Sequence, residues 1–345
     1  MRVWRPQAFL GTRSGSGRRF LITAPLSVIV VAHQGERWLP GCLASVRESL
    51  SGRARLVLVE NDGSACGGAV DLGGVEAKVL RPPRPMGFAE VNNFALRHIE
   101  FDTEAVCFLN QDTVTRQAWL HACLDCLEAD ATLGAVMPLI ENYDGTGWDE
   151  AFLTCAKASP GLYAAMQQGV GACVEHLPPF IAVPEITAAA MVVRTEAVLK
   201  AGPFDPIYGS YYEDYDLCRR ISAVGYKVGI CTRGRVGHYG GSVTTDQRAY
   251  LRRARWIARN RVIYAARWKW RNRPWGLVRY FAVELPRNLA RSALGRSNIP
   301  LRAFLHAQLD LLRLAPRLAS ARRDQRQWHN YLKNLGWPES QAPSA

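Results

Sequence analysis

Short apolar runs rich in β-branched residues alternate with longer helical stretches through the first 140 residues of the chain. Runs of this kind are typical of strands buried on both faces of a sheet, and helices are the usual connections between parallel strands. The alternation predicts an α/β fold with a mostly parallel central sheet and helices on both of its faces. The predicted strands are residues 26–31, 56–59, 77–80, 105–109 and 134–138.

The alternation is interrupted at residues 141–182, which are rich in Gly, Pro and small residues. This stretch is predicted to be an irregular and variable insertion. Beyond it the pattern predicts a strand over 186–193, a short helix over 195–201, a helix that begins at Glu213 and a strand over 228–232.

Polar side chains stand where several predicted strands end. Ala32 begins the loop after the first strand, and Glu60 and Asn61 follow the second. Doubly wound sheets bind ligands at the carboxyl ends of their strands, so these positions are candidates for a ligand site. The alternative is a simple turn rich in Asn, Asp and Gly. No Gly-x-Gly-x-x-Gly follows either of the first two strands, so a dinucleotide site is not predicted.

Two further residues are candidates for a metal site. Asp112 follows the predicted strand 105–109, and His238 lies in a Gly-rich loop after the predicted strand 228–232. A carboxylate at this edge of a sheet can hold a hard divalent cation that binds phosphate oxygens, and neutral imidazole can be another ligand. Each residue also has a structural alternative, because Asp is a common helix cap and a lone His usually serves packing.

Residues 202–220 combine turn-forming Gly and Pro with a carboxylate-rich helix start. Glu213, Asp214 and Asp216 fit there for structural reasons alone, because the first turn of a helix exposes unpaired N–H groups and a partial positive charge. The preceding loop, however, is crowded with aromatic residues, and aromatics beside a carboxylate describe a sugar-binding rim with a general base. The aromatic residues of this loop are Phe204, Tyr208, Tyr211 and Tyr212.

The net charge of +13 is concentrated in the C-terminal part of the chain. Residues 248–345 hold 21 Lys and Arg against four acids, whereas the first 247 residues hold 22 basic and 26 acidic side chains. Aromatics, leucines and arginines at helical spacing over 245–270 and again after Pro300 predict amphipathic helices at an anionic membrane surface. The alternative is that these helices pack on the rest of the chain. A nucleic-acid partner is not predicted, because it would leave the acidic part unexplained.

The cellular location follows from cysteine usage and from the apolar runs. Nine cysteines without a framework indicate reduced thiols in a cytosolic protein. No apolar run approaches the length of a bilayer-spanning helix. Residues 1–24 are predicted to be a flexible basic leader, because the apolar run near Phe20 is too short for a signal peptide. We therefore expect a cytoplasmic protein that is peripheral on the cytoplasmic face of the membrane.

These elements, in this order, resemble the inverting glycosyltransferases of family 2 with the Rossmann-like GT-A fold, within the bacterial rhamnosyltransferase-like group. The resemblance covers about residues 25–245. It implies a nucleotide-sugar half at 25–140, an acceptor and base half at 183–245, and a basic helical tail at 246–345. Each motif is degenerate, but their order and spacing are specific together. The motifs are residues 27–31 with 39–45, 87–93, 109–112, 187–194, 202–220 and 238.

On the donor side, the resemblance implies a divalent metal, Mg²⁺ or Mn²⁺, held by Asp112 and His238, with Asn110 at the first position of the metal motif. Glu60 and Asn61 match the region that binds the nucleobase or ribose. The resemblance also assigns Ala32 to the loop that covers the nucleotide, and Asn92 and Asn93 to nucleotide-sugar binding.

On the acceptor side, the resemblance implies that Asp214 is the catalytic base and that Glu213 or Asp216 positions the acceptor. The implied activity is metal-dependent transfer of a sugar, rhamnose or a related hexose, from a nucleotide-diphospho-sugar. The implied acceptor is a hydroxyl of a saccharide or lipid-linked molecule in cell-surface glycan synthesis. A nucleotidyltransferase and a catalytically silent sugar-binding relative are the alternatives.

Overall fold

The computed structural model describes residues 26–49, 54–62, 77–99, 103–116, 118–240, 247–269, 275–295 and 297–321. The leader predicted at residues 1–24 lies outside the described residues. Residues 322–345 of the basic tail also lie outside them, as does part of the loop after Glu60.

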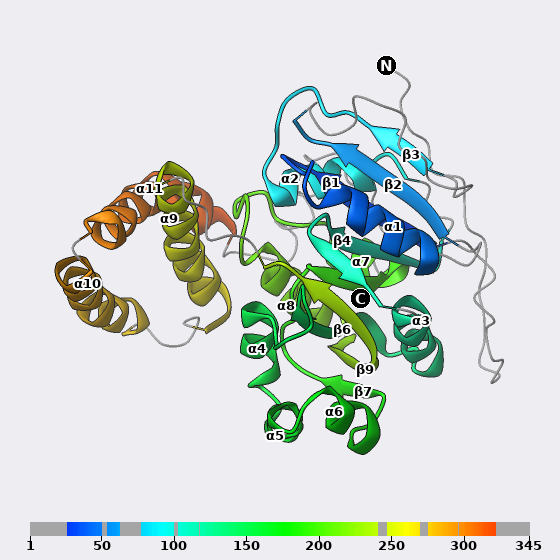
Figure 1. The fold of residues 1–345 in the computed structure, drawn as a ribbon. Helices are drawn as coiled ribbons and strands as arrows, with labels where there is room; N and C mark the ends of the chain where they lie inside the picture. The colour runs from blue at the N-terminus through cyan, green and yellow to red at the C-terminus, as the bar shows by residue number, and fades with distance from the viewer. Residues whose placement is uncertain are drawn as a thin grey trace, which may run out of the picture.

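The described residues form nine strands, which are β1 (Leu26–Ala32), β2 (Ala54–Glu60), β3 (Ala77–Leu80), β4 (Ala105–Asn110), β5 (Thr113–Thr115), β6 (Leu133–Asn142), β7 (Phe180–Ala182), β8 (Ala190–Arg194) and β9 (Lys227–His238). They make one sheet in the order β3-β2-β1-β4-β8-β6-β9-β5, with β7 paired to β9 (Figure 1). Strands β1 to β4 are parallel, and β9 is parallel to β6. Because β8 is antiparallel to both β4 and β6, β6 runs in the same direction as β4. The six strands β1, β2, β3, β4, β6 and β9 therefore all run in one direction. The prediction of a mostly parallel sheet is confirmed.

Helices α1 to α8 pack around this sheet (Figure 1). They are α1 (Leu39–Ser49), α2 (Phe88–Leu96), α3 (Trp119–Ala129), α4 (Glu150–Ala156), α5 (Pro160–Gln167), α6 (Val170–His176), α7 (Thr195–Ala201) and α8 (Glu213–Ala223). The short helix predicted over residues 195–201 and the helix start predicted at Glu213 are both confirmed.

The prediction that residues 141–182 are irregular is wrong, since α4, α5, α6 and β7 lie within them. These helices have only seven or eight residues each, which is too short for periodicity to stand out. Local capping still defines two of them. The Asp149 side chain accepts the Phe152 N–H before α4, and the Ser159 hydroxyl accepts the Leu162 N–H before α5.

Two strands differ in extent from the prediction. β8 begins at Ala190 rather than residue 186, and β9 continues to His238 instead of ending near residue 232. The second half of β9 pairs with β6 after a register shift and also with β5. His238 therefore ends a paired strand and does not lie in a Gly-rich loop. Its position is consequently fixed by sheet hydrogen bonds.

Three C-terminal helices form a lobe beside the sheet domain (Figure 1). α9 (Gln247–Tyr264) continues as a π-helical turn over Ala265–Lys269, and α10 (Gly276–Leu294) and α11 (Ile299–Ala321) pack beyond it. The sequence analysis predicted the first and last of these helices but not α10. Among the described residues, no helix is both long and apolar enough to cross a membrane.

The alternative that the tail packs on the rest of the chain holds for α9. Tyr264 is buried and its hydroxyl donates to Glu185, while Arg267 forms ion pairs with Asp205 at 2.7 Å and with Asp216 at 3.3 Å. The eight cysteines among the described residues are all free and buried, in agreement with reduced thiols.

Candidate active site

The strands that run in one direction end along one edge of the sheet, and the candidate residues meet there. Ala32 pairs with Glu60 across β1 and β2, and the register of β4 against β1 brings Asn110 alongside them. His238 pairs with Thr113 of β5, so it lies beside the turn that carries Asp112. Segments far apart in the sequence therefore converge at the edge where a doubly wound sheet binds ligands.

The imidazole of His238 lies between two carboxylates. Its Nε2 is 3.4 Å from Asp112 Oδ1 and 3.3 Å from Asn110 Nδ2. On the opposite side of the ring, Nδ1 is 3.1 Å from Asp149 Oδ2. Burial alone would lower the pKa of His238, but the two carboxylates outweigh it and raise the pKa to about 9. The two carboxylates therefore stabilise the protonated form of the His238 ring.

Asp112 and His238 fit a divalent metal as two ligands of an open site. A carboxylate oxygen with an imidazole nitrogen suits Mn²⁺, and Mg²⁺ commonly takes one or two protein carboxylates together with substrate phosphates and water. Among the described residues, no three His, Cys, Asp or Glu side chains are grouped to hold a metal ion.

Asp149 was not identified from the sequence. It precedes α4 and contacts the Nδ1 side of the His238 ring, opposite Asp112. Burial would raise the pKa of Asp149, but the hydrogen bond with His238 lowers it below its usual value. A carboxylate in this position fixes the orientation of a ligating imidazole and raises its basicity. In the sequence, Asp149 has the pattern of a helix cap, and this pattern does not predict a contact with His238.

The loop after β1, which was predicted to cover the nucleotide from Ala32 onward, is tied to two neighbouring segments. Gln111 binds the backbone of His33 in both directions, with its Nε2 donating at 2.6 Å and its Oε1 accepting at 2.9 Å. Asp62 accepts the N–H of Gln34, whose φ is +49°. The loop is therefore held in a defined conformation at the ligand edge.

Glu60 and Asn61 are buried and have partners within the protein. Arg81 Nε donates to Glu60 Oε2 at 2.6 Å. Asn61 exchanges two hydrogen bonds with the backbone of Met86, at 2.9 and 2.8 Å. The carboxylate that faces the loop after β1 is that of Asp62, the next residue in the chain and one that sequence analysis did not select.

Asn92 and Asn93 have their side-chain amides bound to backbone groups of the protein. The Asn92 amide donates to the Phe88 carbonyl one turn earlier in α2. The Asn93 amide binds both backbone groups of Phe204, at 2.7 and 3.0 Å. Both side chains are buried, and the Asn93 amide joins α2 to the loop before α8.

The start of α8 is conformationally unusual, because Tyr211 and Tyr212 both have a φ of +73°. Consecutive non-glycine residues in the left-handed region are strained and persist only where the surroundings impose them. The strain lies immediately before the acidic residues of α8.

Asp214 is half-buried and is oriented by backbone donors. Its Oδ2 accepts the Ala188 N–H at 3.1 Å and its Oδ1 accepts the Tyr215 N–H at 2.8 Å. Burial raises the pKa of Asp214 to about 6 against these hydrogen bonds. Ala189, which follows Ala188 in the chain, accepts the N–H of Asn110 at 2.9 Å. Asp214 is therefore connected to the end of β4 through the two neighbouring residues Ala188 and Ala189.

Glu213 and Asp216 occupy very different environments from Asp214. Burial and the charge of Asp214 raise the pKa of Glu213 well above its usual value, and its buried Oε2 has no hydrogen-bond partner among the residues that the structure describes. Asp216 is fully buried, and Arg220, Arg267 and two other donors surround it. Those donors are Tyr208 Oη at 3.2 Å and Trp268 Nε1 at 2.9 Å. Asp216 is therefore a packing ion pair and cannot position an acceptor.

The aromatic loop is mostly interior, which corrects the prediction of an aromatic rim. Phe204 packs against Phe88 and Phe108, and Tyr208 is buried beside Arg267. Tyr212 is half-buried against Tyr264. Of the four predicted aromatic side chains, Tyr211 alone is exposed, at 37%.

Helix α9 holds this loop through a buried amide. The Asn260 side chain is fully buried, and its Nδ2 lies 2.8 Å from each of the carbonyl oxygens of Tyr208, Ser210 and Tyr211. Arg259 adds a hydrogen bond to the Tyr208 carbonyl at 2.6 Å. Neither side chain was identified from the sequence, because the loop and α9 are about 50 residues apart.

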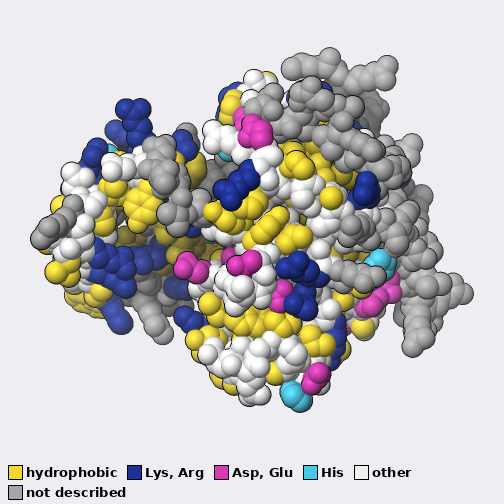
Figure 2. Space-filling model, in the orientation of Figure 1, with side chains coloured by type: hydrophobic (Ala, Val, Ile, Leu, Met, Phe, Trp, Pro, Cys, Tyr) yellow, Lys and Arg dark blue, Asp and Glu magenta, His cyan; other side chains and the backbone are white. Residues whose placement is uncertain are grey.

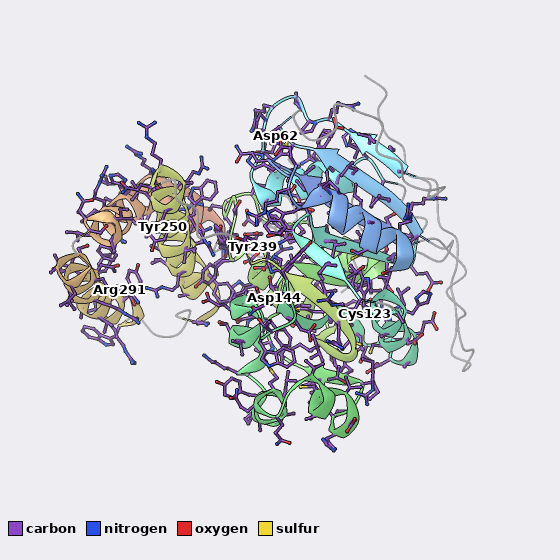
Figure 3. All side chains as sticks on the ribbon, viewed as in Figure 1. Asp62, Cys123, Asp144, Tyr239, Tyr250 and Arg291 are labelled. Atoms are coloured by element: carbon purple, nitrogen blue, oxygen red, sulfur yellow. The ribbon has the colours of Figure 1, made fainter. Side chains whose placement is uncertain are left out.

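The labelled side chains in Figure 3 place Tyr239 and Asp144 near the centre of the molecule, with Asp62 at the upper end of the sheet edge and Tyr250 on α9 across from them. The site combines the Asp112–His238 pair, whose atoms approach to 3.4 Å, with the Asp214 carboxylate, whose pKa is raised by burial. Such a combination can bind an anionic leaving group and accept a proton from a nucleophile.

Comparison with known proteins connects this geometry to a chemistry. A family model described as "Glycosyl transferase family 2" matches residues 27–172, and one described as "Glycosyl transferase family group 2" matches residues 147–315. No curated protein matches the chain.

Three solved structures are similar in fold. GalNAc-T7, crystallised with UDP, GalNAc and Mn²⁺, is 16% identical with a TM-score of 0.53, and the match covers 77% of this chain. The chain spans about half of that structure (51%). The mannosyltransferase PcManGT from Pyrobaculum calidifontis, in complex with GDP-Man and Mn²⁺, is 15% identical with a TM-score of 0.50, covering 91% of this chain and 81% of the other. TarS 1–349 of S. aureus with UDP-GlcNAc is 14% identical with a TM-score of 0.51, covering 90% and 87%.

Proposed function

Because the chain belongs to glycosyltransferase family 2, whose two models together match residues 27–315, and has the GT-A fold, we propose that it is an inverting, metal-dependent hexosyl- or rhamnosyltransferase. The donor is a nucleotide-diphospho-sugar and the acceptor is a hydroxyl of a saccharide or lipid-linked molecule in cell-surface glycan synthesis. The observation that carries this proposal is the Asp214 carboxylate, oriented by two backbone N–H groups near the Asp112–His238 pair.

In this mechanism Asp214 removes the proton of the acceptor hydroxyl. The hydroxyl oxygen forms a bond to the anomeric carbon, and the bond from that carbon to the diphosphate oxygen breaks on the opposite face. The bonding electrons leave with the nucleoside diphosphate, so the configuration is inverted. Asp112 and His238 would hold Mg²⁺ or Mn²⁺, which when bound offsets the charge of the diphosphate. The pKa of about 6 lets Asp214 be ionised at neutral pH while remaining a competent base.

The direct test is product analysis with a panel of nucleotide sugars, Mn²⁺ and candidate acceptors. Release of nucleoside diphosphate together with a glycosylated acceptor supports the transferase. Release of pyrophosphate would identify a nucleotidyltransferase instead. Absence of any release, with donors still raising the melting temperature, would identify a silent sugar-binding relative.

The contact behind His238 gives a prediction about metal affinity. We expect Asp149→Asn to weaken Mn²⁺ binding about 10–100-fold, because removing the carboxylate behind a ligating imidazole releases its orientation and lowers its basicity. Mn²⁺ binding can be measured by electron paramagnetic resonance without turnover.

A matched control for this measurement is Asp144→Asn. Asp144 is an exposed acid in the same segment, and its carboxylate accepts the N–H and the hydroxyl of Thr146. This variant should bind Mn²⁺ as the wild type does. If wild type and Asp149→Asn bind Mn²⁺ with equal affinity, Asp149 does not orient His238 for metal binding.

We further propose that α10 and α11 rest on an anionic membrane surface. Phe281, Leu285 and Leu289 follow helical spacing on one side of α10, and they are 38%, 38% and 48% exposed. Leu309 and Leu312 of α11 are 52% and 71% exposed. Figure 2 shows Lys and Arg side chains beside hydrophobic ones on this lobe. Apolar side chains flanked by arginines suit insertion among anionic lipids.

Vesicle flotation tests this membrane proposal. Wild-type protein should float with phosphatidylglycerol-containing vesicles at low salt. The triple variant Phe281→Gln, Leu285→Gln and Leu289→Gln should partition at least about tenfold less, since burying one such side chain is worth about 1.5–3 kcal/mol. Val79→Gln, which alters an exposed apolar residue of β3, should leave flotation unchanged. Wild-type protein that never floats would contradict the proposal.

A further inference from the structure

The loop immediately before Asp214 is held by hydrogen bonds from two helices. We call residues 208–212 the base loop. Gly209 has a φ of +69°, and Tyr211 and Tyr212 both have a φ of +73°. Tyrosine rarely adopts this left-handed conformation, so it persists only where neighbouring groups impose it. The contacts that impose it here come from α9 on one side and from α2 on the other.

The contacts from α9 centre on one buried amide. The Asn260 side chain has no exposed surface, and its Nδ2 lies 2.8 Å from the carbonyl oxygens of Tyr208, Ser210 and Tyr211. Arg259 Nε donates to Asn260 Oδ1 at 2.8 Å, which fixes the amide with its N–H groups toward the base loop. Arg259 Nη2 also donates to the Tyr208 carbonyl at 2.6 Å. Asn260 therefore joins three carbonyls of the base loop to a single position on α9.

The contacts from α2 come from the first turn of that helix. The Ala89 N–H donates to the Gly209 carbonyl at 2.8 Å, and the Phe88 N–H donates to the Ser210 hydroxyl at 3.1 Å. N–H groups in a first turn have no partner within their own helix, so the base loop satisfies them. A Cβ atom at Gly87 would lie 3.0 Å from the Gly209 carbonyl oxygen, which shows how closely the two segments approach. The base loop therefore has a fixed position between α2 and α9.

The position of the base loop determines the position of the Asp214 backbone. The Tyr212 carbonyl accepts the Asp216 N–H at 3.0 Å, so the base loop ends in the first hydrogen-bonded turn of α8, which contains Asp214. The Asp214 carboxylate is held from a different segment, because it accepts the Ala188 N–H at 3.1 Å. A shift of the base loop would therefore move the Asp214 backbone relative to the group that orients its side chain.

We propose that Asn260 is a positioning residue for the transfer reaction. Its buried amide fixes the base loop and, through that loop, the place from which Asp214 takes the acceptor proton. Asn260 does not itself contact the substrate, because its side chain is fully buried against backbone oxygens. A displacement of about 1 Å at a reacting group can cost about 10²-fold in rate. This inference rests on the proposed transferase function and adds to it a determinant of catalysis on the C-terminal helix α9.

The variant Asn260→Asp tests the inference, because aspartate keeps the size of the side chain and removes both N–H donors. We expect kcat to fall about 10²-fold with the donor and acceptor that the wild type uses. The KM for the donor and the donor-induced rise in melting temperature should not change, because the base loop moves without the Asp112–His238 pair. Residual turnover should still fall at acidic pH, because Asp214 remains the base. Circular dichroism at the assay temperature establishes that the variant is folded.

A milder variant tests the same contact. Arg259→Met removes the hydrogen bonds to the Tyr208 carbonyl and to the Asn260 amide but leaves that amide in place. It should lower kcat by a smaller factor than Asn260→Asp does, again without a change in the KM for the donor. If Asn260→Asp does not fold, Arg259→Met decides the question, and an unchanged kcat in that variant overturns the inference.

The matched control is Thr232→Val, which removes a buried hydrogen bond away from the base loop. Thr232 is fully buried on β9, and its hydroxyl donates to the Pro178 carbonyl at 2.7 Å. This variant should be less stable than the wild type but keep its kcat. An equal fall of kcat in Thr232→Val and Asn260→Asp, or a loss of donor binding in Asn260→Asp, would contradict the inference. Normal kcat in folded Asn260→Asp overturns this inference alone, whereas a wild type that releases no nucleoside diphosphate overturns the proposed function and this inference with it.

Discussion

The Asp214→Asn variant is expected to bind nucleotide sugar as the wild type does and to lose about 10²–10⁴-fold in turnover, the usual contribution of a general base. Asparagine preserves the size of the side chain and can still accept the Ala188 N–H, so the site should keep its shape. What it lacks is a group that takes the acceptor proton. Steady-state release of nucleoside diphosphate measures the loss, and the donor-induced rise in melting temperature measures binding.

The matched control for Asp214→Asn is the neighbouring Glu213→Gln. Burial and the charge of Asp214 raise the pKa of Glu213 well above its usual value, and glutamine keeps the size of this buried side chain while removing its ionisable group. Glu213→Gln should therefore keep most of the turnover. Equal losses in the two variants, or normal turnover in Asp214→Asn, would remove Asp214 from the role of base.

The same assignment predicts the pH dependence of the wild-type enzyme. The pKa of Asp214 is about 6, so the fraction of ionised base falls as pH drops through that value. The value of kcat/KM should then fall about tenfold per pH unit below pH 6 and level off above it. Asp214→Asn should lose this acidic limb from its residual activity.

Asp216→Asn is expected to destabilise the fold by about 3–5 kcal/mol, because breaking a buried ion pair leaves uncompensated charge in the interior. Asp216 is completely buried and accepts from Arg220 Nε at 2.9 Å, while Arg267 also lies 3.3 Å away. Burial opposes its ionisation, but the two arginines hold the pKa of Asp216 below its usual value. Its contribution to stability is therefore present at neutral pH and is lost as pH falls through its folded-state pKa.

Urea unfolding followed by circular dichroism measures this difference. Glu196→Gln is the control, because it breaks an exposed pair with Lys200 and should cost no more than about 1 kcal/mol. Unchanged stability in Asp216→Asn, together with lost turnover, would return Asp216 to a catalytic role.

The donor half of the site was the more predictable from the sequence. Asp112 follows β4 and His238 ends β9. Continuous apolar runs in the sequence predict the buried parts of both strands. The 3.4 Å approach of Asp112 to His238 also depends on two features that were not predicted, the extension of β9 to His238 and its antiparallel pairing with β5. The metal that they would hold remains a prediction.

The acceptor half was less predictable, because the environment of a loop depends on what packs over it. Phe204 and Tyr208 have the composition of a binding rim, yet α2 and α9 cover them. Asp149 reaches His238 from 89 residues away, and its side chain has the local signature of a helix cap only. Tertiary packing decides both cases, and neither has a signal in the local sequence.

The amide of Asn260 has a consequence for any attempt to re-engineer acceptor choice. Its hydrogen bonds tie the loop before Asp214 to a helix encoded about 50 residues later. Consider a chimera that takes residues 202–212 from a relative without taking the corresponding helix. Its positions 211 and 212 would need the left-handed backbone conformation, but the amide that stabilises that conformation here would be missing. The loop and α9 therefore have to be transferred together, and a library of sequence variants that changes one of them must change the other as well.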